Sequence, residues 1–266
     1  MNLKTISIFT LLILLSIGSM SVKADEDFDK AILKSKKALT EAMNTSDEAK
    51  LIKARGQFER ILQLKEKPWL VNYYMALADY GLALVGMRTE DKDKTKKYTE
   101  SGIETITKSI DANPEFCDSF VLLESLNFNR WQYEQEKMEE IISATQYADT
   151  EAKKLDANNP RYVLVTGISQ FYMPEAFGGG VKIALPTLEK SEALFKTYKP
   201  KSELYPDWGQ DMVYGYIALC LLKRDDEGDK AKAKEMIDEG LKINPDSGFL
   251  TGYVMKEYKA SSEDSK

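Results

Sequence analysis

Residues 68–113 read PWLVNYYMALADYGLALVGMRTEDKDKTKKYTESGIETITKSIDAN, and the proline that opens this stretch recurs at a fixed spacing. Pro68, Pro114, Pro160 and Pro206 lie 46 residues apart. An aromatic residue follows each proline at once or after one further residue: Trp69, Phe116, Tyr162 and Trp208. A period of about 20–50 residues is typical of solenoids, whose units bury their apolar faces against their neighbours. The spacing therefore predicts an array of similar units.

The sequence predicts two helices in each unit. Apolar residues recur with helical spacing through the chain, and no segment alternates in the manner of a strand. The predicted apolar helices, each just after a proline, cover 69–88, 115–132, 161–173 and 207–223. The predicted charged helices, apolar on one face only, cover 92–112, 134–157, 181–198 and 229–243. Further helices at 27–43, 47–65 and 247–258 complete an all-α fold.

The charged helices share a spacing of small and large residues. The last one reads Ala233-x3-Ile237-x2-Gly240-x4-Pro245, and the other units repeat parts of this spacing. A small residue lets two packed helices approach closely, and the large residue fills the gap beside it. This spacing resembles the second half of a tetratricopeptide repeat over most of residues 47–245. The resemblance implies a tetratricopeptide-like solenoid of helical hairpins, with repeats of about 46 residues in place of the usual 34 or so.

Two shorter motifs carry a narrower resemblance. Phe177-Gly178-Gly179 precedes a predicted charged helix, and PDWG follows at 206–209. Together they look like exported tetratricopeptide proteins of Bacteroidetes-type bacteria. They are also similar, less closely, to the periplasmic T component associated with TRAP transporters. The resemblance implies an exported helical-repeat protein that binds a partner or a ligand.

The first 24 residues read as a secretory signal peptide. A positive N-terminus precedes an apolar run at 6–17, and the small-x-small pattern at 22–24 predicts cleavage before Asp25. The alternative is a retained membrane anchor, but so short a run does not comfortably span a hydrocarbon core of about 30 Å. We therefore expect a secreted or periplasmic protein with a solenoid over 25–258, no membrane span after cleavage and a disordered tail over 259–266.

Charge and composition narrow the function classes. Removal of the predicted signal peptide takes the formal net charge from −6 to −8, because this segment contains Lys4 and Lys23 and no acid. Nucleic-acid binding needs a basic patch, which an acidic chain disfavours. The chain has no histidine, and so lacks the commonest general base and the commonest zinc ligand. We expect no nucleic-acid partner, no catalytic residue, no metal site and no cofactor.

The two cysteines lie on apolar helices that are two units apart in the predicted register. Packed helices stand about 8–10 Å apart, whereas a disulfide needs Cα atoms within about 7 Å. We therefore predict that Cys117 and Cys220 are buried free thiols.

The run Gly178-Gly179-Gly180 has two interpretations. Successive backbone N–H groups before a helix can hold an anion. The alternative is a tight turn that needs residues without a Cβ atom. No P-loop pattern surrounds the run, and this favours the turn.

The candidate binding surface follows from the tetratricopeptide resemblance, which implies that the apolar helices line a concave face. Tyrosine, tryptophan, amide and arginine side chains on that face are good binding groups. The alternative is that most of these side chains fill the core between the helices. The predicted partner or ligand surface consists of Tyr73, Tyr74, Asn127, Arg130, Trp131, Gln170, Tyr172, Phe177, Gly178, Gly179, Trp208 and Tyr214. We expect a scaffold that binds a protein or peptide partner in the cell envelope. The alternative is a small-ligand carrier or transporter accessory protein, with an apolar pocket near the Gly-rich loop.

Overall fold

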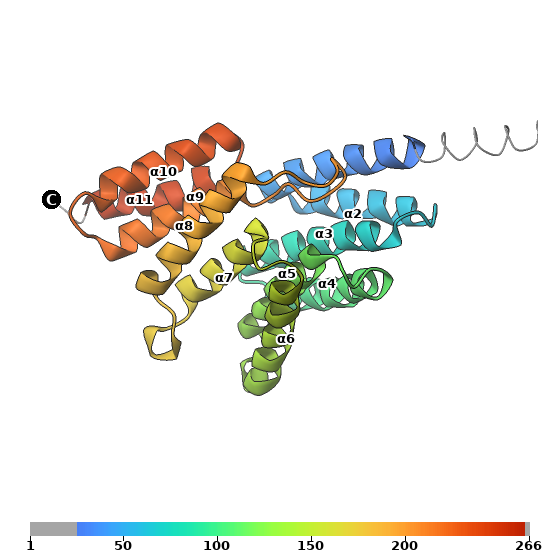
Figure 1. The fold of residues 1–266 in the computed structure, drawn as a ribbon, viewed down its shortest axis with the longest axis horizontal. Coiled ribbons are helices and arrows are strands. Elements are labelled where there is room, and N and C mark those ends of the chain that lie inside the picture. Colours follow the sequence, from blue (N-terminus) through green and yellow to red (C-terminus); the bar gives the residue numbers. More distant parts are fainter. Residues whose placement is uncertain (1–25, 264–266) are drawn as a thin grey trace, which may run out of the picture.

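The computed structural model describes residues 26–263, and all regular secondary structure within this range is helical. A first helix occupies 26–45. The α-helices that follow are α2 (Glu48–Leu62), α3 (Pro68–Arg88), α4 (Lys92–Ala112), α5 (Cys117–Asn129), α6 (Met138–Asp156), α7 (Pro160–Tyr172), α8 (Val181–Thr197), α9 (Gln210–Arg224), α10 (Asp229–Ile243) and α11 (Met255–Glu263). Short 3-10 helices are η1 (Arg130–Gln132), η2 (Gln135–Lys137) and η3 (Glu175–Phe177), and η4 (Phe249–Val254) is a π-helix. Sequential helices pack as hairpins, α3 on α4 through α9 on α10 (Figure 1).

The two helices of a unit differ in how they are buried. Helix α3 is enclosed by its neighbours, and even Asp79 and Tyr73 on it are fully buried. Helix α4 buries one face only, through residues such as Gly102 and Ile106. A Cβ atom added to Gly102 would lie 2.7 Å from a methyl group of Leu126 on α5. The small residue therefore allows α4 to pack closely on α5, the first helix of the next unit.

Two of the four prolines that recur every 46 residues open helices. Pro68 and Pro160 stand at the starts of α3 and α7, where the missing N–H removes no helical hydrogen bond. Pro114 and Pro206 instead precede short non-helical stretches, so the helix starts predicted at 115 and 207 are too early. Before α9 the delay has a clear cause, because Gly209 adopts a left-handed backbone with φ of 106°.

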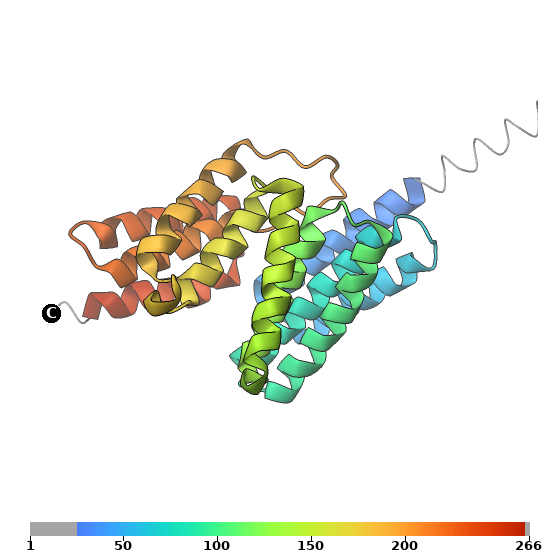
Figure 2. The ribbon, with the colours of Figure 1, turned by 60° about the horizontal axis from the view of Figure 1, so that its bottom comes forward.

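The residues between α8 and α9, 198–209, form an irregular crossing segment that reaches over the N-terminal helices (Figures 1 and 2). Lys36 in the first helix donates from Nζ to two carbonyl oxygens of this segment, at 2.8 and 2.7 Å. Leu204 is buried in the apolar core that α2 and α3 share with the first helix. Its carbonyl oxygen accepts a hydrogen bond of 2.6 Å from the hydroxyl of Tyr74. The crossing segment thus joins the C-terminal helices to the N-terminal ones.

The first helix also contacts the end of α10. The side-chain amides of Asn44 and Asn244 exchange hydrogen bonds of 3.1 and 3.0 Å. A Cβ atom added to Gly248 would collide with the carbonyl oxygen of Asn44, so the backbones approach closely here. Segments from opposite ends of the chain therefore support each other directly.

The ends of the described range bear on two predictions. The predicted signal peptide over 1–24 lies outside the described residues. At the other end α11 continues through Glu263, past Lys259, where the sequence predicts that a disordered tail begins. No helix between residues 26 and 263 combines the length and the apolar character needed to cross a membrane.

Both cysteines are buried free thiols, as the repeat register predicts. Burial raises the pKa of Cys117 and of Cys220 to about 12 in each case. The thiolate is the reactive form of cysteine, so both groups act as small apolar side chains at neutral pH.

Candidate functional site

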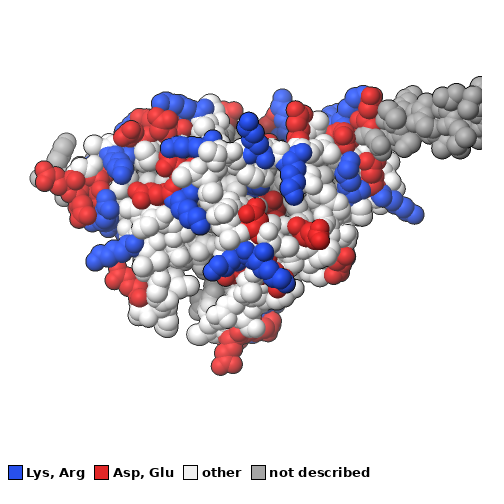
Figure 3. All heavy atoms as spheres, in the orientation of Figure 1, with Lys and Arg blue, Asp and Glu red and all other residues white. Residues whose placement is uncertain are grey.

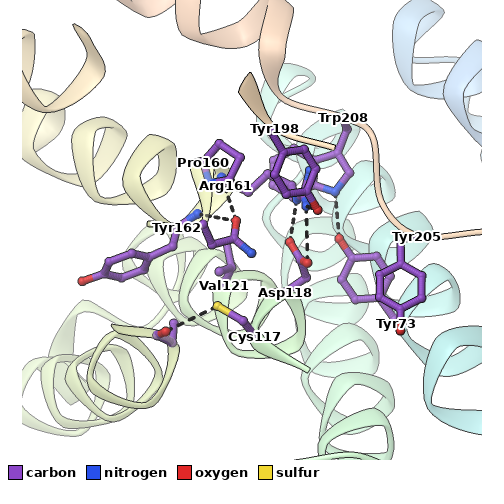
Figure 4. Close-up of polar contacts among 12 residues, drawn as sticks. Tyr73, Cys117, Asp118, Val121, Pro160, Arg161, Tyr162, Tyr198, Tyr205 and Trp208 are labelled. Atoms are coloured by element: carbon purple, nitrogen blue, oxygen red, sulfur yellow. Dashed lines mark hydrogen bonds and ion pairs between the residues drawn. The ribbon is translucent and has the colours of Figure 1, made fainter. Parts of the chain in front are cut away.

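A buried polar junction lies where the crossing segment meets α5 and α7 (Figure 4). Arg161 is fully buried, and its Nε lies 2.5 Å from a carboxylate oxygen of Asp118. The guanidinium also donates to the hydroxyl of Tyr198 at 2.7 Å and lies over its ring, 4.8 Å from the centroid. Each charge is thus paired within the protein, and this junction is part of the internal packing.

Three predicted surface residues belong to this junction. Trp208 donates from Nε1 to the hydroxyl of Tyr73 at 2.8 Å and packs against all three apolar clusters of the described chain. Tyr73 and Tyr74 are almost completely buried. Burial, and after it the charge of Asp118, raises the pKa of Tyr73 well above its usual value. Tyr73 and Tyr74 therefore belong to the interior and do not face a groove, whereas Trp208 is partly buried and joins the three clusters.

The other predicted residues of the apolar helices are largely covered or paired. Asn127 and Tyr214 are buried, and Asn127 donates to a carbonyl of its own helix. Arg130 forms ion pairs with Glu134 and Glu140 at 2.9 and 2.5 Å. Trp131 and Gln170 are half-buried.

The loop between α7 and α8 is the exposed part of the predicted surface. Tyr172 is 49% exposed and Phe177 is 78% exposed. In Figure 3 the surface around this loop, at the lower left, carries few charges. Exposed aromatic side chains in weakly charged surroundings are typical of binding surfaces.

The glycines of this loop form a tight turn. Gly178 and Gly180 have φ of 85° and 92°, and a Cβ atom on Gly179 would collide with the carbonyl oxygen of Met173. The N–H groups of 177–180 all donate to carbonyl oxygens of the loop or of α7. None of these four N–H groups is left to hold an anion, which supports the turn interpretation.

An aromatic row runs from this loop to the π-helix. We define the aromatic row by the residues Phe171, Tyr172, Tyr216, Phe249 and Tyr253. The ring centroids of Phe171 and Tyr172 lie 5.1 Å apart, and those of Tyr172 and Tyr216 lie 6.3 Å apart. The ring of Phe249 lies 5.0 Å from that of Tyr216 and 6.1 Å from that of Tyr253. The first and third rings are buried, whereas Tyr253 is 45% exposed. Buried rings therefore hold the ring of Tyr172, and Phe249, itself half-buried, holds the ring of Tyr253.

Polar groups accompany the aromatic row. The Nζ atom of Lys223 lies 5.0 Å from the centroid of the Phe171 ring. Burial, and after it the neighbouring Tyr172, raises the pKa of Tyr216 and of Tyr253. The same two causes raise the pKa of Tyr80, on α3, to about 12. The hydroxyl of Tyr172 is thus the common neighbour of tyrosines from α3, α9 and the π-helix.

The residues of this site that were not part of the predicted surface are Phe171, Tyr216, Lys223, Phe249 and Tyr253. The last two are four residues apart within a predicted helix, and this spacing places them on one face. That signal was present in the sequence. Lys223 joins them only because α9 packs beside α7, and local periodicity does not show such a contact.

Comparisons with known proteins show the fold. No family model matches the sequence, and no curated protein matches it. Among solved structures, the HusA haemophore from Porphyromonas gingivalis matches with a TM-score of 0.61 and 19% identity, over 76% of this chain and 94% of that one. A thermophilic TPR protein of Thermus thermophilus matches with a TM-score of 0.52 and 14% identity, over 84% and 98% of the two chains. The chain has an all-α, tetratricopeptide-like fold of sequential helical hairpins, as the sequence predicts.

Proposed function

We propose that this protein is an exported binding module that holds a small, flat aromatic ligand against the aromatic row and the adjoining loop 173–180. The observation that carries the proposal is the exposure of aromatic rings that neighbouring, less exposed rings fix in place. Tyr172 and Tyr253 are about half exposed, and they pack on Phe171, Tyr216 and Phe249. Pre-arranged aromatic groups bind flat ligands at a low cost in conformational entropy.

The polar groups of the site indicate the charge of the ligand. The Lys223 ammonium lies at one end of the aromatic row, and hydroxyl groups lie along it. An ammonium group attracts carboxylate, and the row itself offers apolar area to a planar ring system. A planar aromatic ligand that bears a carboxylate group fits this combination.

A structural neighbour supports a ligand of this class. HusA, which shares the fold, is a haemophore, and haem is a flat macrocycle. Haem and its metal-free counterpart, protoporphyrin IX, carry two carboxylate groups. They are therefore the first ligands to test against this chain.

A titration of the purified protein with haem and with protoporphyrin IX, followed by the absorbance of the ligand, tests the proposal. Tyr172→Ala and Phe177→Ala should each raise Kd at least tenfold, because each removes exposed aromatic area from the site. Tyr147→Ala is the matched control, since Tyr147 is a 56% exposed aromatic residue on α6, outside the aromatic row. Equal Kd values for the site variants and the control, or no binding by the wild-type protein, would contradict the proposal.

A second candidate function is the binding of a protein or peptide partner in the cell envelope, including a transporter component. Three neighbouring side chains of the loop favour it, because Tyr172, Met173 and Phe177 are all exposed. Exposed apolar anchors of this kind often carry most of the energy of a protein interface. Deletion of residues 175–178 should abolish capture of such a partner while the helix content, measured by circular dichroism, stays near native. Capture that survives the deletion would exclude this loop as the docking site.

A further inference from the structure

Only some of the residue types that can coordinate a haem iron are available in this chain. Histidine, cysteine thiolate, methionine and tyrosine are the usual protein ligands of haem iron. The chain contains no histidine. Cys117 and Cys220 are buried, and burial raises the pKa of each thiol to about 12. Tyrosine and methionine therefore remain.

Two tyrosines of the aromatic row are accessible, Tyr172 and Tyr253, and Tyr172 is the one that leads directly into the exposed loop 173–180. Tyr172 ends α7 and is 49% exposed. Its ring packs edge to face on Phe171 and on Tyr216, at centroid distances of 5.1 and 6.3 Å. These contacts hold the ring in place, while about half of the side chain stays exposed.

We propose that the hydroxyl oxygen of Tyr172 coordinates the ferric iron of an iron tetrapyrrole bound on the aromatic row. This inference rests on the proposed function and names the group that would recognise the metal. The phenolic O–H bond breaks as the Fe–O bond forms. The proton passes to the hydroxide that leaves the iron, which becomes water. The iron stays ferric, so the step needs no oxidant or reductant.

Met173 is the competing ligand, because it follows Tyr172 directly and is 37% exposed. A thioether is a soft donor, whereas an anionic oxygen suits a hard ferric ion better. We therefore expect the iron to bind Tyr172 in preference to Met173.

The test compares Tyr172→Phe, Met173→Leu and the control Tyr147→Phe, each titrated with ferric haem and with metal-free protoporphyrin IX. Phenylalanine keeps the ring of Tyr172 and removes only its oxygen. Tyr172→Phe should weaken ferric haem binding at least tenfold and leave protoporphyrin binding within twofold of the wild-type value. It should also abolish the tyrosinate vibrations that resonance Raman spectroscopy detects in the wild-type complex. The other two variants should bind ferric haem as tightly as the wild type does and should keep the tyrosinate vibrations.

Several other results would overturn the inference. The first is a Tyr172→Phe variant that binds ferric haem with the affinity and spectrum of the wild type. The second is a loss of ferric haem binding in Met173→Leu instead of in Tyr172→Phe. If the wild-type protein binds neither porphyrin, the proposed function fails and this inference fails with it. Binding of both porphyrins without a tyrosinate signal would refute the iron ligand alone.

Discussion

At the scale of single residues, Glu124 on α5 is a carboxyl group that the fold buries without a partner for its Oε2 atom. Burial, and after it the charge of Asp149, raises the pKa of Glu124 from 4.5 to about 8. Between these two values the folded state binds the proton more tightly than the unfolded state does. The contribution of Glu124 to the free energy of unfolding therefore falls as the pH rises through this window.

Replacement of this carboxyl group should stabilise the protein in a pH-dependent way. Glu124→Gln should raise the free energy of unfolding at pH 7 relative to the wild type, by roughly 3 kcal/mol at about 1.4 kcal/mol per pKa unit. At pH 4 the two proteins should differ much less, because the wild-type side chain is then largely protonated in both states. Urea unfolding at the two pH values measures this. A difference that is the same at both would show that the variant acts through packing alone.

The cysteines give a second prediction at this scale. Both are buried free thiols whose pKa burial raises to about 12. An Ellman assay should therefore detect almost no reactive thiol in the native monomer and two per chain in denaturant without reductant. A count of zero in denatured monomer would mean that the helices of the two cysteines are not separated as described.

At the scale of elements, the helices follow from the sequence and the crossing segment does not. Most predicted helix bounds agree closely, since hydrophobic periodicity and prolines are local signals; α4 and α10 match the predicted 92–112 and 229–243. The 46-residue period places Pro206 at a helix start, but the chain there is irregular and reaches back to the first helix. The contacts that hold it come from residues such as Lys36 and Tyr74, far away in the sequence. Local patterns carry no information about such pairs.

The crossing segment should contribute substantially to stability. Leu204 is buried in the N-terminal core, and truncation of a buried leucine to alanine usually costs about 2–5 kcal/mol. We expect Leu204→Ala to lower the free energy of unfolding by about 3 kcal/mol. Leu64→Ala is the control, because Leu64 is 58% exposed and its truncation should be nearly neutral. Equal urea midpoints for the two variants would show that the crossing segment is only a connector.

At the scale of the whole molecule, the sequence identified part of the candidate site. Tyr172, Phe177 and Gly178 of the loop are exposed, whereas Gly179 is buried. Tyr73, Tyr74 and Tyr214 are instead buried, because aromatic residues on an enclosed helix fill the core more readily than they face a groove. Residue type alone does not distinguish these two roles. Exposure does, and it depends on the packing of all the helices together.

The central claim is that ligand binding occurs at the aromatic row and its loop, on a scaffold that stays rigid. Residue-specific backbone amide shifts, recorded by NMR with and without protoporphyrin IX, test this most directly. Changes should be confined to residues 170–181, 216–223 and 249–254, and the amides of α4 and α10 should keep their shifts. Changes centred on the buried junction at Arg161 or on α4, or no change at saturating ligand, would contradict the account.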